Sequence, residues 1–233
     1  MSDPFVSLAA AAAVTSRIKL GTAISLINQH DPIVLAKQVS TLDRLCNGRF
    51  IFGVGAGWNV EEMGKHGVEF KERWAQLRER VEAMKALWTQ EEATFHGKYV
   101  NFDRVWSYPK PVQTPHPPIL LGTLGTELGR QRVAEFGDGW IPVTSFFRDV
   151  PAAIEDMRNR TVAAGRAADI SVSMLFIPLE PPEPPEPPEH KVAEALACNP
   201  ERVVVSIAAL ERDAALRAVD DVIALVERIA ASG

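Results

Sequence analysis

The chain has 233 residues, 46% of them hydrophobic, and a formal net charge of −5. This composition is ordinary for a soluble protein and does not favour nucleic-acid binding as its main role. No apolar run is long enough to span a membrane, and the alanine run at 9–13 lacks the charged start of a signal peptide. Cys46 and Cys198 are too few for a disulfide framework and have no metal-binding spacing, so we expect a cytoplasmic protein without a metal site.

Predicted helices and strands alternate along the chain with almost no exception. Asp3-Pro4 and Asp31-Pro32 both combine an N-cap residue with proline at the first helical position. Helices are predicted at 5–16, 33–45, 60–90, 126–136, 150–164, shortly after the proline-rich run, and at 214–231. Strands are predicted at 18–26, 50–55, 118–122, 139–143, 170–177 and 202–207. In the irregular stretch 93–118, residues 99–102 and 109–112 are candidates for a small hairpin.

This alternation predicts an α/β fold with a parallel sheet and right-handed crossovers. Six strands fit either an open, doubly wound sheet or most of an eight-stranded barrel. A complete barrel typically has about 250 residues, so the chain is slightly short for one. Composition and spacing alone leave both architectures open, and we expect residues 1–233 to form one domain in either case.

The segment 49–58 is the most informative part of the sequence. It is predicted to be a fully buried strand that runs into a glycine-rich turn, Gly53-x-Gly55-x-Gly57. Glycines at the carboxyl end of a parallel strand let the backbone approach a ligand closely. The run is not the dinucleotide fingerprint, because Trp58 occupies the position of its third glycine. The alternative is that these glycines serve only a sharp strand-to-helix turn.

Several short motifs, in their order along the chain, resemble the luciferase-like monooxygenase superfamily, especially its branch that depends on coenzyme F-420. The motifs are Asp3-Pro4-Phe5, residues 15–22, Asp31-Pro32 with residues 35–37, residues 42–45 before 47–49, the 53–58 turn, residues 117–122 and residues 134–140. The resemblance implies a TIM-type (β/α)8 barrel with its cofactor, coenzyme F-420 or alternatively FMN, at the carboxyl ends of the strands. Members normally have a strand, a helix and a strand before the segment that matches Asp3. We therefore expect an incomplete barrel with six of the eight strands.

The resemblance also implies a set of cofactor-binding residues. In the first turn they are Gly55, Ala56 and Gly57, with Trp58 as a wall of the pocket; Trp58 alone would more often be core. Gly122, Thr123, Leu124 and Gly125 precede a helix whose N-terminus suits a phosphate, and Thr144 could add a hydroxyl, with Ser145 a weaker candidate. The alternative for this loop is an ordinary connection with Thr126 as N-cap. The family often has a non-prolyl cis peptide in the preceding strand, here between Ala23 and Ile24; the alternative is a regular strand.

One histidine is a candidate for catalysis. His30 follows a strand at its carboxyl end, beside Asp31-Pro32, and could move protons near neutral pH. The alternative, a loop residue near a helix start, is somewhat favoured. The other four histidines are expected at the surface, and Glu61 and Glu62 are expected to favour the start of their helix.

The repeat at 181–189, three Pro-Pro-Glu triplets, predicts an extended polyproline II linker within 180–190. A recognition motif for an aromatic groove is the less favoured alternative. The functional hypothesis is a flavin- or deazaflavin-dependent oxidoreductase that acts on an unidentified organic small molecule. The alternative is a catalytically silent cofactor-binding relative or a fragment of a longer enzyme. Unpaired edges at strands 18–26 and 202–207 further predict self-association into a homo-oligomer.

Overall fold

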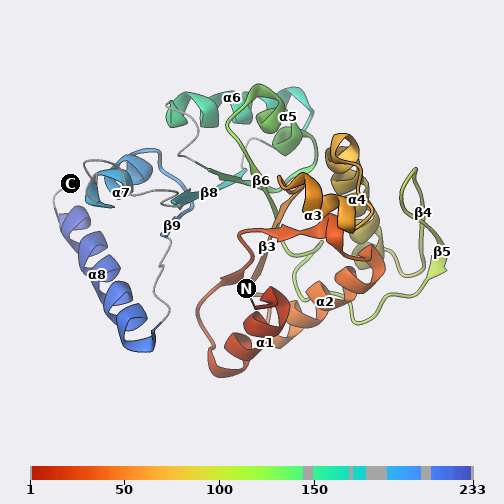
Figure 1. The fold of residues 1–233 in the computed structure, drawn as a ribbon, viewed down its shortest axis with the longest axis horizontal. Helices are drawn as coiled ribbons and strands as arrows, with labels where there is room; N and C mark the ends of the chain where they lie inside the picture. Colours follow the sequence, from red (N-terminus) through yellow and green to blue (C-terminus); the bar gives the residue numbers. More distant parts are fainter. Residues whose placement is uncertain (1, 144–148, 168–169, 177–187, 206–210, 232–233) are drawn as a thin grey trace. The chain divides into compact units, whose positions relative to one another are not determined.

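The computed structural model describes residues 2–143, 149–167, 170–176, 188–205 and 211–231 (Figure 1). By its internal contacts the chain divides into two compact units. Unit 1 comprises residues 1–122 and 136–138, and unit 2 comprises residues 123–135 and 139–233. Each unit combines parallel strands with helices, as the alternation predicts.

Parallel strands form the centre of unit 1. They are β1 (Leu20–Gly21), β2 (Ser25–Leu26), β3 (Phe50–Gly55) and β6 (Ile119–Thr123). Both short strands pair with β3, with Leu20 opposite Phe50 and Ser25 opposite Val54, while β3 pairs with β6 on its other side. The predicted single strand at 18–26 is therefore two short strands, interrupted at residues 22–24.

The helices of unit 1 are α1 (Pro4–Val14), α2 (Pro32–Leu45), α3 (Val60–Lys65) and α4 (Arg73–Thr89), together with the short 3-10 helices η1 (Ile27–Gln29) and η2 (Phe70–Glu72). Of these, α1, α2 and α3 begin within one residue of the predicted starts. Asp3 accepts a hydrogen bond from the Val6 amide, and Asp31 accepts from the Ile33 and Val34 amides. Both predicted N-caps are confirmed. The first helix ends at Val14, two residues earlier than predicted.

The aromatic core of unit 1 lies around β3. Phe50 and Phe52 have no exposed surface, and Phe5 of α1 packs against both, with ring centroids 6.5 and 6.4 Å away. Trp88 of α4 meets Phe52 edge to face at 6.3 Å. These contacts hold β3 in place, and with β3 the glycine turn at its carboxyl end.

The prediction of one long helix over 60–90 is wrong. Helix α3 ends at Lys65, and Gly67 takes a left-handed conformation with φ of 71°. The Val68 amide donates to the Met63 carbonyl at 3.0 Å, which closes the end of α3, and Val68 is buried. A left-handed glycine ends a helix, so the chain restarts as η2 and α4.

The predicted hairpin partner is also wrong. Strand β5 (Asn101–Val105) pairs with β4 (Ala93–His96), not with residues 109–112. The carboxylate of Glu79 accepts hydrogen bonds from the amides of Lys98 (3.0 Å) and Val100 (2.6 Å), and so fixes the turn of this hairpin. This contact comes from α4, which is distant in sequence, so local propensity did not reveal it.

Unit 2 has parallel strands β7 (Gly139–Pro142), β8 (Ser171–Phe176) and β9 (Arg202–Val205), with Gly139 opposite Ser171 and Ser173 opposite Arg202. Its helices are α5 (Glu127–Phe136), α6 (Val150–Ala163), α7 (Pro188–Ala197) and α8 (Arg212–Ala231). Residues 180–187 of the linker predicted at 180–190 lie outside the described residues, and Pro188 already starts α7. This start corrects the predicted extent of the extended segment.

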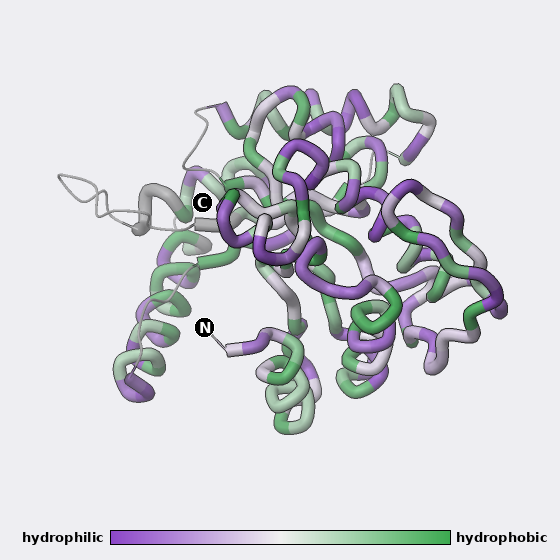
Figure 2. Tube along the Cα trace, turned by 45° about the vertical axis from the view of Figure 1, so that its right-hand side comes forward, coloured by the Kyte–Doolittle hydropathy of each residue, from purple (hydrophilic) through white to green (hydrophobic). Residues whose placement is uncertain are grey.

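Helix α8 alternates hydrophobic and hydrophilic residues along its length (Figure 2). Leu216, Val219, Ile223 and Val226 follow one another at intervals of three or four residues and are each 42–53% exposed, so they form an apolar stripe on one side of the helix. Of the helices that the structure describes, none is long and apolar enough to cross a membrane.

Candidate functional site

Near the carboxyl ends of β3 and β6, the structure brings together three residues that the resemblance implies. Gly55 ends β3 and lies opposite Leu26 of β2, and β6 pairs with β3 up to Leu121. The Ala23–Ile24 peptide bond just before β2 is cis, as predicted. The side chain of Ile24 lies beside Gly55 and Gly122, close to the edge of the sheet where parallel α/β proteins bind their ligands.

The side chain of Ile24 covers both glycines. A Cβ atom at Gly55 would overlap Ile24 Cδ1, and a Cβ atom at Gly122 would lie 2.7 Å from Ile24 Cγ2. At Gly122 the added atom would meet the branched part of the Ile24 side chain, whereas at Gly55 it would meet the terminal Cδ1, which can rotate away. The sequence interpretation expected a bare backbone facing the ligand; the structure places Ile24 over that backbone. Ile24 is itself 37% exposed and so offers an apolar surface to a ligand.

The turn after β3 continues this edge. Ala56 is 3% exposed, and Gly57 takes a φ of 85°, a conformation that favours glycine. Trp58 is 84% exposed, which excludes the core alternative for this residue. Asn59 caps α3 by accepting from the Glu62 amide at 3.0 Å. The turn thus presents a large, accessible indole close to Gly57.

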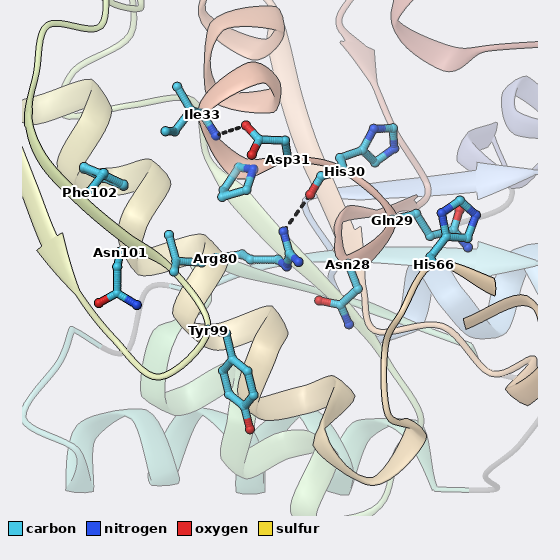
Figure 3. A pocket seen from close by; sticks show the side chains of 12 residues that line it. Asn28, Gln29, His30, Asp31, Ile33, His66, Arg80, Tyr99, Asn101 and Phe102 are labelled. Atoms are coloured by element: carbon cyan, nitrogen blue, oxygen red, sulfur yellow. Dashed lines mark hydrogen bonds between the residues drawn. The ribbon is translucent and has the colours of Figure 1, made fainter. Parts of the chain in front are cut away.

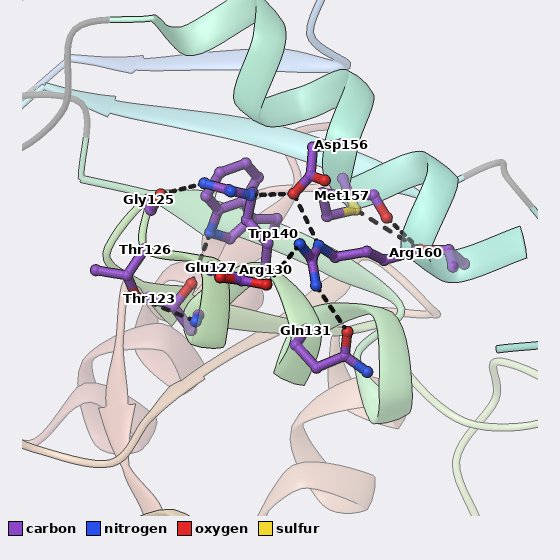
Figure 4. A network of polar contacts seen from close by, with 12 residues as sticks. Thr123, Gly125, Thr126, Glu127, Arg130, Gln131, Trp140, Asp156, Met157 and Arg160 are labelled. Atoms are coloured by element: carbon purple, nitrogen blue, oxygen red, sulfur yellow. Dashed lines mark hydrogen bonds and ion pairs between the residues drawn. The ribbon is translucent and has the colours of Figure 1, made fainter. Parts of the chain in front are cut away.

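The loop before α5 belongs to unit 2 and is held by hydrogen bonds (Figure 4). Thr123 Oγ1 accepts from Trp140 Nε1 at 2.8 Å, and the Gly125 carbonyl accepts from Arg130. Thr126 Oγ1 accepts from the Gly129 amide at 3.1 Å, which confirms its capping role, while Leu124 is 47% exposed. Thr144 and Ser145 lie outside the described residues.

An ion-pair network joins this loop to α6. Arg130 Nε lies 2.5 Å from an Asp156 carboxylate oxygen, which Arg160 Nε also contacts at 2.8 Å. Hydrogen bonds from Arg160 and Arg130 lower the pKa of Asp156 below its ordinary value. Because Arg130 also donates to the Gly125 carbonyl, the network fixes the backbone from which α5 starts.

His30 lies elsewhere in unit 1. It follows η1 and lines a cavity of about 390 Å³, together with His66 and Arg80 (Figure 3). Its carbonyl accepts from Arg80 Nη1 at 2.6 Å. Burial lowers the pKa of His30 below its ordinary value, His66 and Arg80 act in the same direction, and Asp3 opposes them. None of the cofactor-binding residues that the resemblance implies lines this cavity.

Three polar residues near these features were missed from the sequence. Ser25 and Asn28 are each 3% exposed, and Ser25 Oγ, Asn28 Oδ1 and Arg80 Nε have no hydrogen-bond partner among the described residues. Ser25 and Asn28 interrupt an apolar strand-and-turn segment, which is a usable signal, since buried polar side chains are normally hydrogen-bonded. Arg80 gives no such signal, because most arginines of a helix are solvated. Within the described ranges, no three His, Cys, Asp or Glu side chains gather as metal ligands.

Comparisons with known proteins identify a family and several relatives of the chain. The family of luciferase-like monooxygenases matches residues 1–184. An uncharacterized protein of Mycobacterium tuberculosis is 43% identical over 229 residues, which cover 98% of this chain and 75% of the relative. The FMNH2-dependent dimethylsulfone monooxygenase of Pseudomonas putida is 31% identical over 71% of this chain and 46% of its own length. The F-420-dependent glucose-6-phosphate dehydrogenase of Kineococcus radiotolerans is 37% identical over 66% of this chain and 47% of its own length.

Solved structures share the fold. The monooxygenase RslO1 from Streptomyces bottropensis has a TM-score of 0.68 and 31% identity over 74% of this chain and 53% of its own. The coenzyme F-420-dependent tetrahydromethanopterin reductase from Methanopyrus kandleri has a TM-score of 0.66 and 24% identity over 75% of this chain and 54% of its own. The chain thus spans about half the length of these proteins. The predicted fold class, an incomplete TIM-type barrel, is confirmed. Seven parallel strands are described instead of the six predicted, because the predicted strand at 18–26 is the two short strands β1 and β2.

Proposed function

Because the chain belongs to the luciferase-like monooxygenase family, we propose that it binds a deazaflavin or flavin and acts as an oxidoreductase on an organic small molecule. The observation that carries this proposal is the position of Ile24 over Gly55 and Gly122 at the carboxyl edge of the sheet. Ile24 is partly exposed there and gives an apolar surface against which a planar ring can pack.

The residues of this edge fit such a ring. Because Gly55 and Gly122 have no side chains, the side chain of Ile24 can lie across the two strands that carry them. The exposed indole of Trp58 is available as a second apolar contact. When bound, the cofactor supplies the hydride chemistry. The role of Ile24 and Trp58 is then to orient the ring and to exclude water from it.

The loop at residues 123–125 of unit 2 has features of its own that suit a phosphate. Residues 123–125 precede the ten-residue helix α5, whose first amides and dipole favour an anion. Thr123 Oγ1 already accepts from Trp140, so its remaining hydrogen can be donated to a phosphate oxygen. We therefore assign Thr123, Leu124 and Gly125 to phosphate binding, as the resemblance implies.

Coenzyme F-420 is the first candidate and FMN the second. The F-420-dependent sugar-phosphate dehydrogenases of Intrasporangium calvum and Kineococcus radiotolerans are 36% and 37% identical to the chain, against 31% and 29% for the two FMNH2-dependent monooxygenases. The monooxygenases match a slightly longer part of the chain, 71% against 62% and 66% for the dehydrogenases. FMN therefore remains the second candidate cofactor.

Titration of the purified chain with F-420, FMN and NADP⁺ tests the proposal. F-420 should bind tightest, and Ile24→Glu should weaken it by tenfold or more, because a carboxylate replaces an apolar surface, about 1.4 kcal/mol. Ile18→Glu is the matched control, since Ile18 is also exposed, at 56%, but lies outside the site. Tightest binding of NADP⁺, or equal loss in both variants, would refute the assignment.

A catalytically silent relative is the second candidate. The chain covers only about half of the enzymes with named activities. Activity is tested by following oxidation of the bound, reduced cofactor with a panel that includes dimethylsulfone and glucose 6-phosphate, the substrates in two relatives' names. Binding without turnover of any substrate would favour the silent relative.

A further inference from the structure

The apolar stripe of helix α8 borders the side on which the helix packs against its own unit. Leu216, Val219, Ile223 and Val226 make up the stripe and are each 42–53% exposed, whereas Leu225, on the packed side, is 6% exposed. The helix contacts α7, which belongs to the same unit. The stripe repeats at intervals of three and four residues, the spacing with which one helix packs along another. By its spacing and exposure the stripe is therefore suited to a second helix.

A row of acidic residues borders the stripe on its other side. Asp213, Asp220 and Glu227 are exposed and follow one another at seven-residue intervals. With Leu216 and Ile223 at heptad position a, all three carboxylates fall at position e. Residues at positions e and g form the ion pairs that select the partner and the orientation of paired helices. A partner helix for α8 therefore needs an uncharged stripe bordered by basic residues.

The same row disfavours pairing of α8 with another α8. In an antiparallel pair the two e rows lie side by side, so the carboxylates of one copy would face those of the other, and like charges repel. In a parallel pair each e row faces position g of the other helix. Position g of α8 offers no cation, because it holds Ala215, Val222 and Ile229.

The exposed side of α2 has the complementary pattern. Its residues are Val34, Lys37, Gln38, Thr41, Arg44 and Leu45. The four uncharged residues repeat at intervals of four and three, as positions d and a, and both basic residues then fall at position g. Asp43 is the acidic residue of α2, and it is fully buried. Helix α2 thus presents an uncharged stripe bordered by a basic row.

We propose that α8 of one copy of the chain packs in parallel along α2 of a second copy. In parallel helices position g of one faces position e of the other, so Lys37 meets Asp220 and Arg44 meets Glu227. Antiparallel packing would put the acidic and basic rows on opposite sides of the contact. The charges therefore select both the orientation and the register.

The apolar residues of the two stripes meet in this register. Leu45, which is 61% exposed, lies level with Ile223, which is 51% exposed, and Thr41 lies level with Val219. Burial of these side chains supplies most of the attraction, while the exposed ion pairs contribute less and decide specificity. Each copy carries both surfaces, so two copies that exchange the contact twice form a closed dimer. No cofactor-binding residue takes part, so the inference is independent of the proposed function.

Analytical ultracentrifugation of two charge-reversed proteins tests the proposal. The first protein carries Lys37→Glu and Arg44→Glu, and the second carries Asp220→Lys and Glu227→Lys. Each protein alone should self-associate about tenfold more weakly than the wild type, because like charges then face each other across the contact. A mixture of the two should associate as the wild type does. In the mixture the reversed α2 meets the reversed α8, and the unchanged α2 meets the unchanged α8.

Asp221→Lys is the matched control. Asp221 is also an exposed acid of α8, but it falls at position f, away from the stripe, so this variant should self-associate as the wild type does. If a charge-reversed protein fails to fold, Lys37→Ala with Arg44→Ala removes the ion pairs without repulsion and should still weaken association. A monomeric wild type, unchanged association of the folded variants, a mixture that associates no more than its components, or an equal effect of Asp221→Lys would overturn the proposal.

Discussion

A methyl group at Gly122 should destabilise the protein through its contact with Ile24. The added Cβ would lie 2.7 Å from Ile24 Cγ2 and 3.5 Å from the Val54 carbonyl oxygen. Cγ2 is bonded directly to the branched Cβ of Ile24, so it cannot swing away without a rotamer or backbone shift. We expect Gly122→Ala to lower the free energy of unfolding by about 1–3 kcal/mol, the usual range for overpacking, and the Tm by about 2–4 °C for each kcal/mol.

A double-mutant cycle separates this contact from other effects of the added methyl group. In an Ile24→Ala background the clash is absent, so Gly122→Ala should cost less there, with a coupling energy of about 1 kcal/mol or more. Urea unfolding followed by circular dichroism measures all four proteins, provided that each unfolds in one transition. Equal costs of Gly122→Ala in both backgrounds would refute the geometry of the site.

Gly64→Ala is the control for adding a methyl group. Gly64 lies in α3, and a Cβ there would meet no atom within 4 Å. Alanine is the better helix former, so this variant should be stabilised by about 0.5–1 kcal/mol. Destabilisation of Gly64→Ala would show that the loss at Gly122 does not report on Ile24.

Three further predictions concern other parts of the chain. Asp43 is fully buried and accepts from the amides of Val112 (2.7 Å) and Gln113 (3.0 Å) and from the Gln113 side chain (2.7 Å). Asp43→Ala should therefore lower the free energy of unfolding in urea by about 3 kcal/mol. A decrease under about 1 kcal/mol would contradict this role of Asp43. Because the pKa of folded His30 is lowered from 6.5, the stability linked to it is present above pH 6.5 and lost as the pH falls through the lowered pKa. His30→Gln should therefore flatten the fall in unfolding free energy between about pH 7.5 and about pH 5, and an unchanged slope would contradict the shift. Among the described strands, β1 and β2 pair only with β3, and β9 pairs only with β8, so light scattering should show self-association through these open edges. The apolar stripe of α8 is a second exposed surface, so Ile223→Glu should reduce the self-association. A monodisperse wild-type monomer would argue against a homo-oligomer.

Local signals predicted most of the fold. An aspartate followed by proline marks the starts of α1 and α2 because the cap and the fixed proline φ act within a few residues. The apolar run of β3 is equally local. The break after α3 was missed, although Gly67 was visible, because a glycine inside a helical pattern is compatible with either outcome until its neighbours are placed.

Contacts distant in sequence were not predictable in the same way. The β4–β5 turn depends on Glu79, about twenty residues earlier, and Ile24 covers glycines that lie 31 and 98 positions later. The sequence identified the glycines and, through the family resemblance, the cis bond, but not the side chain that lies over those glycines. The cavity beside Arg80 likewise exists only once α2, α4 and the hairpin are packed together.

Amide hydrogen exchange with and without F-420 tests the central claim most directly, since it reports where the cofactor binds. The account predicts slower exchange on F-420 addition in peptides that cover residues 22–26, 53–60 and 120–126, with little change in residues 97–105 of the β4–β5 hairpin. FMN in place of F-420 should protect the same peptides if the site accepts either ring. Protection confined to the hairpin and the start of α2, or no protection at saturating F-420, would contradict the account.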